Sequence, residues 1–319
     1  MTTNARLRAL VELADTGSVR AAAQRLVVTE ASVSGAISAL AAEVGVPLLD
    51  RDGRGVRLTA AGRRYVAYAR RILGLHEEAL AAARGEADPA RGTLRLAAVT
   101  TAGEHLLPTL LASFRAEYPA VVLGLEVAPR QAVWPKLAHH EVDLVVAGRP
   151  PADGPARVRA VRPNSLVVVG PPGAFDPAPF EPAAATWLLR EPESGIRATT
   201  TALLSALEIA PPQLTLGSHG AVVAAAVAGL GVTLVSRPAV RAHLESGALV
   251  ELAVPGTPLQ RPWHVVSQPA PTATTELFVH HLLAHRELGW RAPGTRLNRS
   301  ASDSATAPGN VSDSGLHTL

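Results

Sequence analysis

The sequence predicts an amino-terminal all-α winged helix-turn-helix, a linker helix and a carboxy-terminal α/β domain of two lobes. Two short amphipathic helices with a brief turn between them lie within residues 18–45. A basic segment and a long helical pattern follow, and from residue 93 short strands alternate with helices. The expected limits are 1–58 for the winged helix-turn-helix, 59–85 for the linker helix, 86–92 for a hinge, 93–290 for the two-lobed domain and 291–319 for a disordered tail.

Capping residues and periodicity define the two short helices. Ser18 follows Gly17 and begins the first helix, and Thr29 caps the second, which Gly45 ends. The apolar face of the first helix is expected to be Val19, Ala22, Ala23 and Leu26, and that of the second Val33, Ile37, Leu40 and Val44. Two capped helices joined by a three-residue turn indicate a helix-turn-helix. A helical hairpin within some other all-α core is the alternative, which the basic segment that follows disfavours.

The outer face of the second helix is expected to read DNA. It is small and uncharged, and it lacks the Arg, Asn or Gln that make bidentate base contacts, so readout would fall to Ser hydroxyls and Ala methyl groups. The candidate DNA-binding residues of the two helices are Ser18, Thr29, Glu30, Ala31, Ser32, Ser34, Gly35 and Ser38.

Residues 51–59 are expected to form the wing. Turn-forming residues at 52–53 and 55 separate two short strands. Between residues 51 and 71, seven Arg and one Asp give a net charge of +6, twice the +3 of the whole chain. This concentration favours phosphate contacts, for which Arg51, Arg54 and Arg57 are the candidates. For the Arg residues at 63, 64, 70 and 71, a solvated helix face is an equal alternative.

The linker helix carries a mostly apolar stripe that a lone helix could not bury. Thr59 caps the helix, and Gly85 with Asp88-Pro89 is expected to end it. The stripe includes the candidate dimerisation residues Tyr65, Ala69, Ile72, Leu73 and Leu80. Pairing with the same helix of a second subunit would bury them and would place two recognition helices on a palindromic site, in a dimer or tetramer. The alternative is that the stripe packs on the chain's own carboxy-terminal domain.

Alternating strands and helices predict a largely parallel sheet in the two-lobed domain. In the first lobe the expected strands are 93–99, 121–127 and 143–147, and the expected helices are 104–118 and 133–140. Crossovers near 162 and 260 divide the domain into lobe 1, at 93–161 and 262–290, and lobe 2, at 162–261. This arrangement looks like a periplasmic-binding-protein-type effector domain.

Two helix starts in this domain have chemistry that suits a small anion. Thr100 and Thr101 follow the first strand, while Ser194, Gly195 and Arg197 follow the strand at 187–190. At such positions hydroxyl groups and unpaired backbone N–H groups meet at the positive end of a helix. We therefore expect a small anionic effector between the lobes, with plain helix capping as the alternative for the threonines.

Residues 17–62 resemble the amino-terminal domain of LysR-type transcriptional regulators; their sequence is GSVRAAAQRLVVTEASVSGAISALAAEVGVPLLDRDGRGVRLTAAG. The chain departs from the usual family residues at Glu30, Gly35, Ala41 and Leu49. From Gly92 onward, GTLRLAAVTTAGEHLLPTLLASFRAEYPAV and LEVAPRQAVWPKLAHHEVDLVVAGRPP are similar to the LysR subfamily that regulates carbon-fixation (Calvin cycle) operons. The resemblance implies a DNA-binding regulator with an effector-binding domain, and in that subfamily phosphorylated metabolites or reduced nicotinamide nucleotide are sensed.

Composition argues against several other classes. Cys is absent, which excludes disulfides and thiolate metal sites. The pairs His139-His140 and His280-His281 are adjacent rather than spaced as helical ligands, so no metal and no cofactor are expected. No secretory signal or long apolar span is evident, which indicates a cytoplasmic protein without a membrane partner and disfavours a solute receptor. A DNA-binding head fused to a catalytic two-lobed domain remains the alternative, although no catalytic motif supports it.

Overall fold

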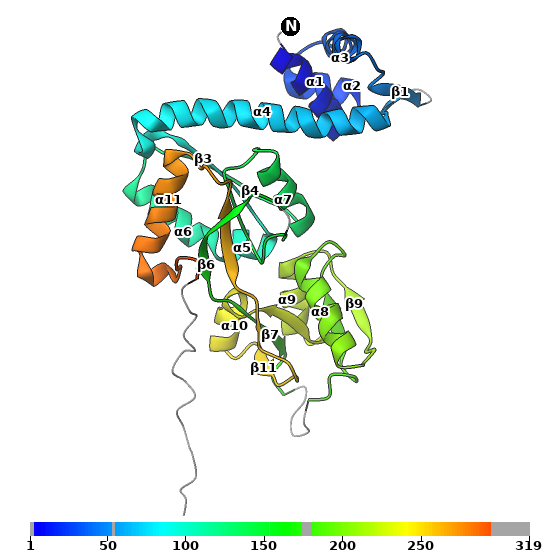
Figure 1. Ribbon diagram of the computed structural model, residues 1–319. Helices are drawn as coiled ribbons and strands as arrows, with labels where there is room; N and C mark the ends of the chain where they lie inside the picture. The colour runs from blue at the N-terminus through cyan, green and yellow to red at the C-terminus, as the bar shows by residue number, and fades with distance from the viewer. Residues whose placement is uncertain (1–2, 53–54, 153, 174–179, 295–319) are drawn as a thin grey trace, which may run out of the picture.

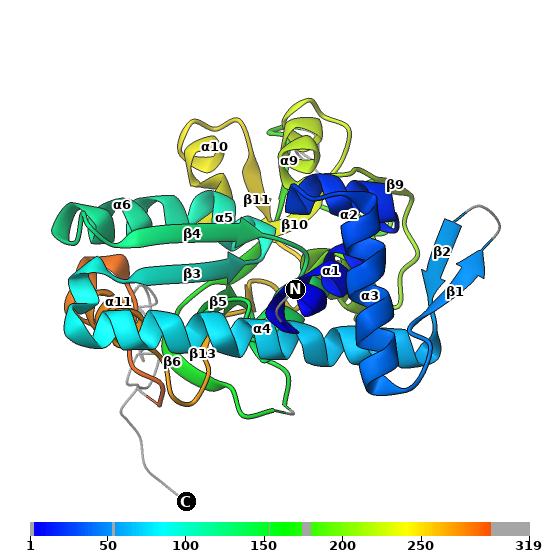
Figure 2. The same ribbon diagram turned by 90° about the horizontal axis from the view of Figure 1, so that it is seen from above.

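The computed structural model describes residues 3–52, 55–152, 154–173 and 180–294. A small helical head lies on one end of a long helix, and the two lobes follow on the other side of that helix (Figure 1). The wing extends past the end of the long helix (Figure 2). Most of the tail expected to be disordered, residues 295–319, lies outside the described residues.

The head consists of α1 (Thr3–Thr16), α2 (Val19–Leu26), α3 (Glu30–Val44) and the antiparallel wing strands β1 (Leu49–Asp52) and β2 (Gly55–Leu58). Ser18 and Thr29 cap α2 and α3 through their hydroxyls, and Gly45 ends α3 in the left-handed conformation. The core of the head is built around Leu7, Leu10, Leu13, Val33, Ile37 and Leu40. The prediction that Val44 belongs to the buried face is wrong, because Val44 is the last residue of α3 and is 37% exposed.

The linker helix is α4 (Ala60–Ala87), followed by the single turn η1 (Pro89–Arg91). It continues through Gly85, where the sequence was expected to end it. One glycine costs a helix about 1 kcal/mol, which is less than the roughly 3 kcal/mol of a proline, so Pro89 sets the end instead. At the other end of α4, a Cβ on Gly62 would lie 2.1 Å from the carbonyl oxygen of Leu48, so only glycine allows α4 to reach the wing.

Lobe 1 is a five-stranded sheet in the order β4-β3-β5-β13-β6. Its strands are β3 (Thr93–Ala98), β4 (Val122–Val127), β5 (Leu144–Ala147), β6 (Arg157–Arg162) and β13 (Trp263–Ser267). The first three are parallel, and β13 is antiparallel to both of its neighbours. Its helices are α5 (Thr100–His105), α6 (Leu107–Glu117), α7 (Arg130–Ala138) and α11 (Ala273–Ala284), with η3 (Arg286–Leu288) after α11.

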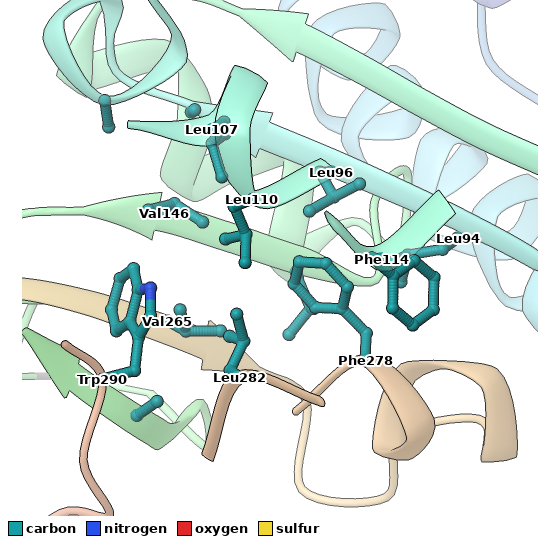
Figure 3. Close-up of a cluster of buried hydrophobic side chains, with 14 of the residues drawn as sticks. Leu94, Leu96, Leu107, Leu110, Phe114, Val146, Val265, Phe278, Leu282 and Trp290 are labelled. Carbon is teal, nitrogen blue, oxygen red and sulfur yellow. The ribbon is translucent and has the colours of Figure 1, made fainter. Parts of the chain in front are cut away.

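The core of lobe 1 lies where α6 and α11 meet the sheet (Figure 3). Phe114 of α6 and Phe278 of α11 pack edge to face with ring centroids 5.0 Å apart. One prediction for this lobe is wrong, and one strand was not predicted. The helix expected at 104–118 is divided at Leu106, because a new helix begins there with Pro108 in its first turn. The strand β6, with the sequence RVRAVR, was missed although its residues alternate.

Lobe 2 contains β7 (Ser165–Gly170), β8 (Trp187–Leu189), β9 (Gln213–Thr215), β10 (Thr233–Ser236), β11 (Val250–Leu252) and β12 (Leu259–Gln260). Its helices are α8 (Gly195–Ala206), α9 (His219–Val227) and α10 (Arg241–Glu245). The short helix η2 (Arg237–Val240) comes directly before α10. The expected largely parallel sheet is wrong here, because β7 is antiparallel to β10, β11 and β12. The strands β8 and β9, which α8 connects, are parallel, and a parallel bridge also joins Trp187 of β8 to Val232.

The chain passes between the lobes twice, at residues 163–164 and 261–262. Asn164 ties these crossings together: its side-chain Nδ2 donates to the carbonyl oxygen of Arg261 at 2.9 Å, and Arg261 N donates to the carbonyl oxygen of Asn164 at 2.8 Å.

Within the described residues, no single helix is both long and apolar enough to cross a membrane. The helices α2 and α3 reach that length and hydropathy only as a pair bent by 105°.

Candidate functional site

A cavity of about 630 Å³ lies between the two lobes. Ligand pockets in proteins commonly measure about 300–1,000 Å³, so it has room for a metabolite. Lobe 1 lines it with the ends of β3 and β5 and the start of α7, and lobe 2 with the end of β8 and the start of α8. The crossing segment at 260–264 closes one side. The carboxyl ends of strands and the amino ends of helices thus meet at this place, as is usual in α/β ligand sites.

Four of the five residues predicted to bind an effector line this cavity. Thr100 and Thr101 begin α5, and their hydroxyls make no hydrogen bond to any other residue that the structure describes. Ser194 caps α8, with its Oγ accepting from Arg197 N at 3.4 Å, and Gly195 is the first residue of that helix. Both helix starts therefore face the same space, one from each lobe.

The expectation for Arg197 is wrong, because its side chain leaves the cavity. Its Nη1 donates to the carbonyl oxygen of Arg190 at 2.8 Å and to Thr215 Oγ1 at 3.1 Å. These bonds hold α8 against the ends of β8 and β9. Arg197 is thus a packing residue of lobe 2 and does not line the cavity.

Sequence reasoning missed Arg130, the first residue of α7, which lines the cavity from lobe 1. Its Nη2 donates to the carbonyl oxygen of Arg149 at 2.8 Å, and its guanidinium carbon lies 5.9 Å from the ring centroid of Trp134. A Cβ on Gly148 would lie 3.7 Å from Arg130 Nη1, and one on Gly195 3.6 Å from its Cδ. Arg130 therefore spans the space between lobe 1 and the start of α8.

The positive charge in the cavity exceeds the negative charge. Burial, and then the charge of Arg261, lower the pKa of the Arg130 guanidinium. Arg261 Nη2 donates to Thr199 Oγ1 at 3.0 Å, and neither arginine has a carboxylate partner among the described residues. Arg190 does have one, since it binds Glu191 through two bonds of 2.6 and 2.7 Å. The guanidinium groups of Arg130 and Arg261 thus give the cavity a positive charge that favours binding of an anion.

A sequence signal for Arg130 existed, since it follows Pro129 between the strand expected at 121–127 and the helix expected at 133–140, and proline is common where a helix begins. Only helix starts with hydroxyl residues were considered. Arg149 and Arg261 gave no local signal, because they reach the cavity from a strand end and a crossing segment that come together only in the folded chain.

The predicted DNA-reading face of α3 is exposed. Its exposed members are Glu30, Ala31, Ser34, Gly35 and Ser38. Two other candidates serve the helix cap: Thr29 Oγ1 accepts from Ser32 N at 3.1 Å and shares a hydrogen bond of 2.8 Å with Ser32 Oγ. Ser18 is half-buried, where it caps α2. These hydroxyls therefore have intramolecular partners before any DNA arrives.

The wing presents Arg57 outward. Its side chain is 66% exposed, and its Nη2 lies 3.9 Å from Asp50 Oδ2. Arg51 lies in β1 opposite Val56, and only its backbone is described. Arg54 lies outside the described residues. Of the three phosphate candidates, Arg57 is the one whose side chain the structure places.

The apolar stripe of α4 is divided between two surroundings. Ala69 is fully buried in the core of the head, and Tyr65 and Leu73 pack against that core, so the head covers these three candidates. Ile72 and Leu80 remain 46% and 38% exposed. Two residues that were not singled out, Tyr68 and Leu75, are also exposed, at 62% and 46%.

Lobe 1 touches α4 through the turn that ends α7. A Cβ on Gly74 would lie 2.1 Å from the carbonyl oxygen of His139, so the two backbones meet there without a side chain between them. His140, at φ 60°, adopts the left-handed conformation and pairs through its Nδ1 with Glu78 of α4. The alternative that α4 packs on the chain's own carboxy-terminal domain is therefore correct for this face of the helix.

Arg70 of α4 joins this contact to the head. It pairs with Asp15 of α1, and its Nη1 lies 3.6 Å from Glu141 Oε1 of lobe 1. Burial lowers the pKa of Arg70, but its bonds with Asp15 and the charges of Asp15 and Glu141 outweigh burial and raise it. One guanidinium thus connects the head, the linker helix and lobe 1.

A winged helix-turn-helix joined through a helix to a two-lobed domain with a ligand-sized cleft defines the class of ligand-responsive DNA-binding proteins. The chain belongs to the LysR family of bacterial transcriptional regulators. Residues 5–63 match the model described as "Bacterial regulatory helix-turn-helix protein, lysR family", and residues 87–287 match "LysR substrate binding domain".

Similar proteins support this assignment. The regulator CbbR of Rhodospirillum rubrum is 34% identical over 77% of this chain and 83% of its own length. The regulator CfxR of Cupriavidus necator is 31% identical over 91% of this chain and 96% of its own. Among solved structures, that of CbnR, a LysR family transcriptional regulator, covers 91% of this chain and 99% of its own with a TM-score of 0.65 at 22% identity, which shows the same fold.

A first prediction concerns the wing. Replacing Arg57 by Ala should weaken binding to all DNA duplexes by a similar factor, because a phosphate contact carries no sequence information. The slope of log K against log salt should fall by about 0.9 for each phosphate that the protein no longer neutralises, measured by fluorescence anisotropy at several salt concentrations. Arg115→Ala, at an exposed position of α6 in lobe 1, is the control and should leave the slope unchanged. An unchanged slope in the Arg57 variant would remove this residue from the interface.

Proposed function

We propose that this regulator senses a small anionic metabolite in the cleft between its lobes and thereby changes how paired heads bind a promoter. The observation that carries the proposal is the convergence of Arg130 and Arg261 on a cavity without a carboxylate partner for either among the described residues. Guanidinium groups bind carboxylates and phosphates through parallel hydrogen bonds. The hydroxyls of Thr100 and Thr101 add further donors from lobe 1.

The relatives suggest the kind of metabolite and of promoter. A structure of the CcmR regulatory domain from Synechocystis is described as a complex with 2-PG, a small anion, and has a TM-score of 0.55 to this chain at 24% identity. Relatives from Acidithiobacillus ferrooxidans and Allochromatium vinosum are named RuBisCO operon transcriptional regulators and are 31% and 32% identical. We therefore propose a carbon-fixation operon as the target and a phosphorylated metabolite as the effector.

Binding without catalysis fits the lining of the cleft. Nucleophilic catalysis requires a hydroxyl bonded to a base. Among the described lining residues, Thr199 Oγ1 donates to the carbonyl oxygen of Gly195, and Ser194 Oγ receives a backbone N–H. The carboxylate of Glu191 is occupied by Arg190. His264 also lines the cleft, but no hydroxyl that the structure describes there is hydrogen-bonded to its imidazole or to the carboxylate of Glu191, which favours a receptor over the alternative of a catalytic two-lobed domain.

A second prediction tests the cleft. Arg130→Ala should weaken binding of an anion at least tenfold, because a charge-assisted hydrogen bond is worth about 1.5–3 kcal/mol. Calorimetric titration with 2-PG, other phosphorylated sugars and acids, nicotinamide nucleotides and dicarboxylates measures this directly, and operator binding without ligand should not change.

The matched control is Arg197→Ala, which removes a guanidinium of lobe 2 that does not line the cavity. It should retain most of the affinity. A neutral or cationic ligand that binds most tightly, or normal anion binding by the Arg130 variant, would contradict the anion cleft without affecting the DNA-binding assignment.

We also propose that a second copy of the chain covers the exposed part of the stripe. Tyr68, Ile72 and Leu75 follow one another at intervals of four and three residues, the spacing of a helix-helix seam. A dimer formed there would bring two heads to one palindromic site.

A third prediction tests this seam. Ile72→Asp should convert the dimer to a monomer and lower operator affinity to that of a half-site, because burying an unpaired carboxylate costs several kcal/mol. Light scattering gives the oligomeric state, and footprinting gives the protected length. Arg71→Asp places the same residue at the neighbouring exposed position and should remain a dimer. An Ile72 variant that stays dimeric and protects the whole operator would exclude the seam.

A further inference from the structure

Three metal-ligating side chains meet on lobe 1, outside the cleft. Glu117 ends α6, His281 lies in the last turn of α11, and His285 follows that helix. None of the three lines the cavity between the lobes. We propose that they bind one divalent transition-metal ion of the zinc class, a site independent of the effector cleft.

The distances suit a single ion. Glu117 Oε2 lies 2.8 Å from His281 Nδ1 and 3.3 Å from His285 Nε2, and the three ligand atoms all lie within 4.8 Å of one another. Bonds of about 2.0–2.2 Å at tetrahedral angles place ligand atoms roughly 3.3 Å apart, so small side-chain rotations suffice. Two histidines and one carboxylate are a set that zinc accepts with a fourth, open position for water.

The helical spacing explains why the two imidazoles converge. His281 and His285 are four residues apart, which places them on one side of α11, and their ring centroids lie 4.3 Å apart. The adjacent pair His280-His281, from which no metal was expected, has diverging side chains: His281 is 2% exposed and buried, whereas His280 is exposed. The i, i+4 pair was present in the sequence and was overlooked.

The surrounding groups orient these ligands as metal sites require. His285 Nδ1 lies 2.8 Å from Glu287 Oε1, and His281 Nε2 lies 3.1 Å from Ser113 Oγ. Each imidazole thus has one nitrogen held by a neighbour and the other directed at Glu117. The remaining carboxylate oxygen of Glu117 accepts from Tyr118 Oη at 2.6 Å. Carboxylate and hydroxyl partners of this kind fix the orientation of ligating histidines and increase their basicity.

The bound ion would join two segments that are far apart in the sequence. Glu117 and His281 are separated by 164 residues, and α11 also reaches the hinge, where Thr274 Oγ1 donates to the carbonyl oxygen of Pro89 at 3.0 Å. A metal at this place would therefore fasten the helix that supports the end of the linker. A hydrogen-bonded cluster without a metal is the competing explanation.

The test uses the full-length protein without an affinity tag, treated with a chelator and then dialysed. Titration with Zn²⁺ by calorimetry, and with Co²⁺ by visible absorption, should show one saturable site per chain with the spectrum of a four-coordinate ion. His285→Ala and Glu117→Gln should each raise the dissociation constant at least tenfold, and both positions are exposed enough to be replaced without loss of the fold.

His280→Ala is the matched control and should bind the ion as the unchanged chain does. His281→Gln is the second variant at the buried ligand, and it should abolish the Co²⁺ spectrum while circular dichroism stays the same. Absence of a saturable site in the unchanged protein, or equal affinity in the His285, Glu117 and His280 variants, would overturn the proposal in favour of the hydrogen-bonded cluster.

Discussion

Gly74 brings the backbone of α4 against the turn at residues 139–140, and this contact fixes the position of the head relative to the cleft. A side chain at residue 74 would separate the two segments, and the pair of His140 with Glu78 would then break. Holding a residue other than glycine in the left-handed conformation, as at His140, costs about 1–2 kcal/mol. The packing of the turn against α4 offsets this cost. The contact with α4 and the left-handed conformation of His140 therefore stabilise each other.

The same turn is one end of α7, whose other end carries Arg130 into the cleft. On the proposed function, an anion bound by Arg130 would pull on the start of α7, and a shift of this short helix would move residues 139–141 against α4. Arg70 continues the connection to Asp15 in the head. Ligand binding and DNA binding can be coupled only through contacts that differ between two states. The contacts that run from α7 through residues 139–141 and α4 to Asp15 connect the cleft with the head without a break.

Sequence reasoning found what depends on local chemistry. The caps at Ser18 and Thr29, the position of α3 and the helix starts at Thr100 and Gly195 follow from residue type and spacing. Predictions from the sequence failed where contacts with distant segments determine the position of a side chain. Ala69 belongs to the apolar stripe by periodicity, but it is buried in the core of the head. Arg197 lies in the first turn of a helix at the cleft, but its side chain is bonded to Thr215 of another strand. Strand direction in lobe 2 likewise depends on pairing that no local pattern records.

The central claim is that the contact between α4 and residues 139–141 transmits effector binding to the head. The most direct measurement is the ratio of the anion's dissociation constants with and without saturating operator DNA, which couplings of this kind place at about 5–150. We expect Glu78→Ala, which removes the partner of His140, to bring this ratio close to 1 while both separate affinities persist. Glu77→Ala, which removes only the partner of Arg8 in the head, should keep the ratio of the unchanged chain. An undiminished ratio in the Glu78 variant would contradict the account.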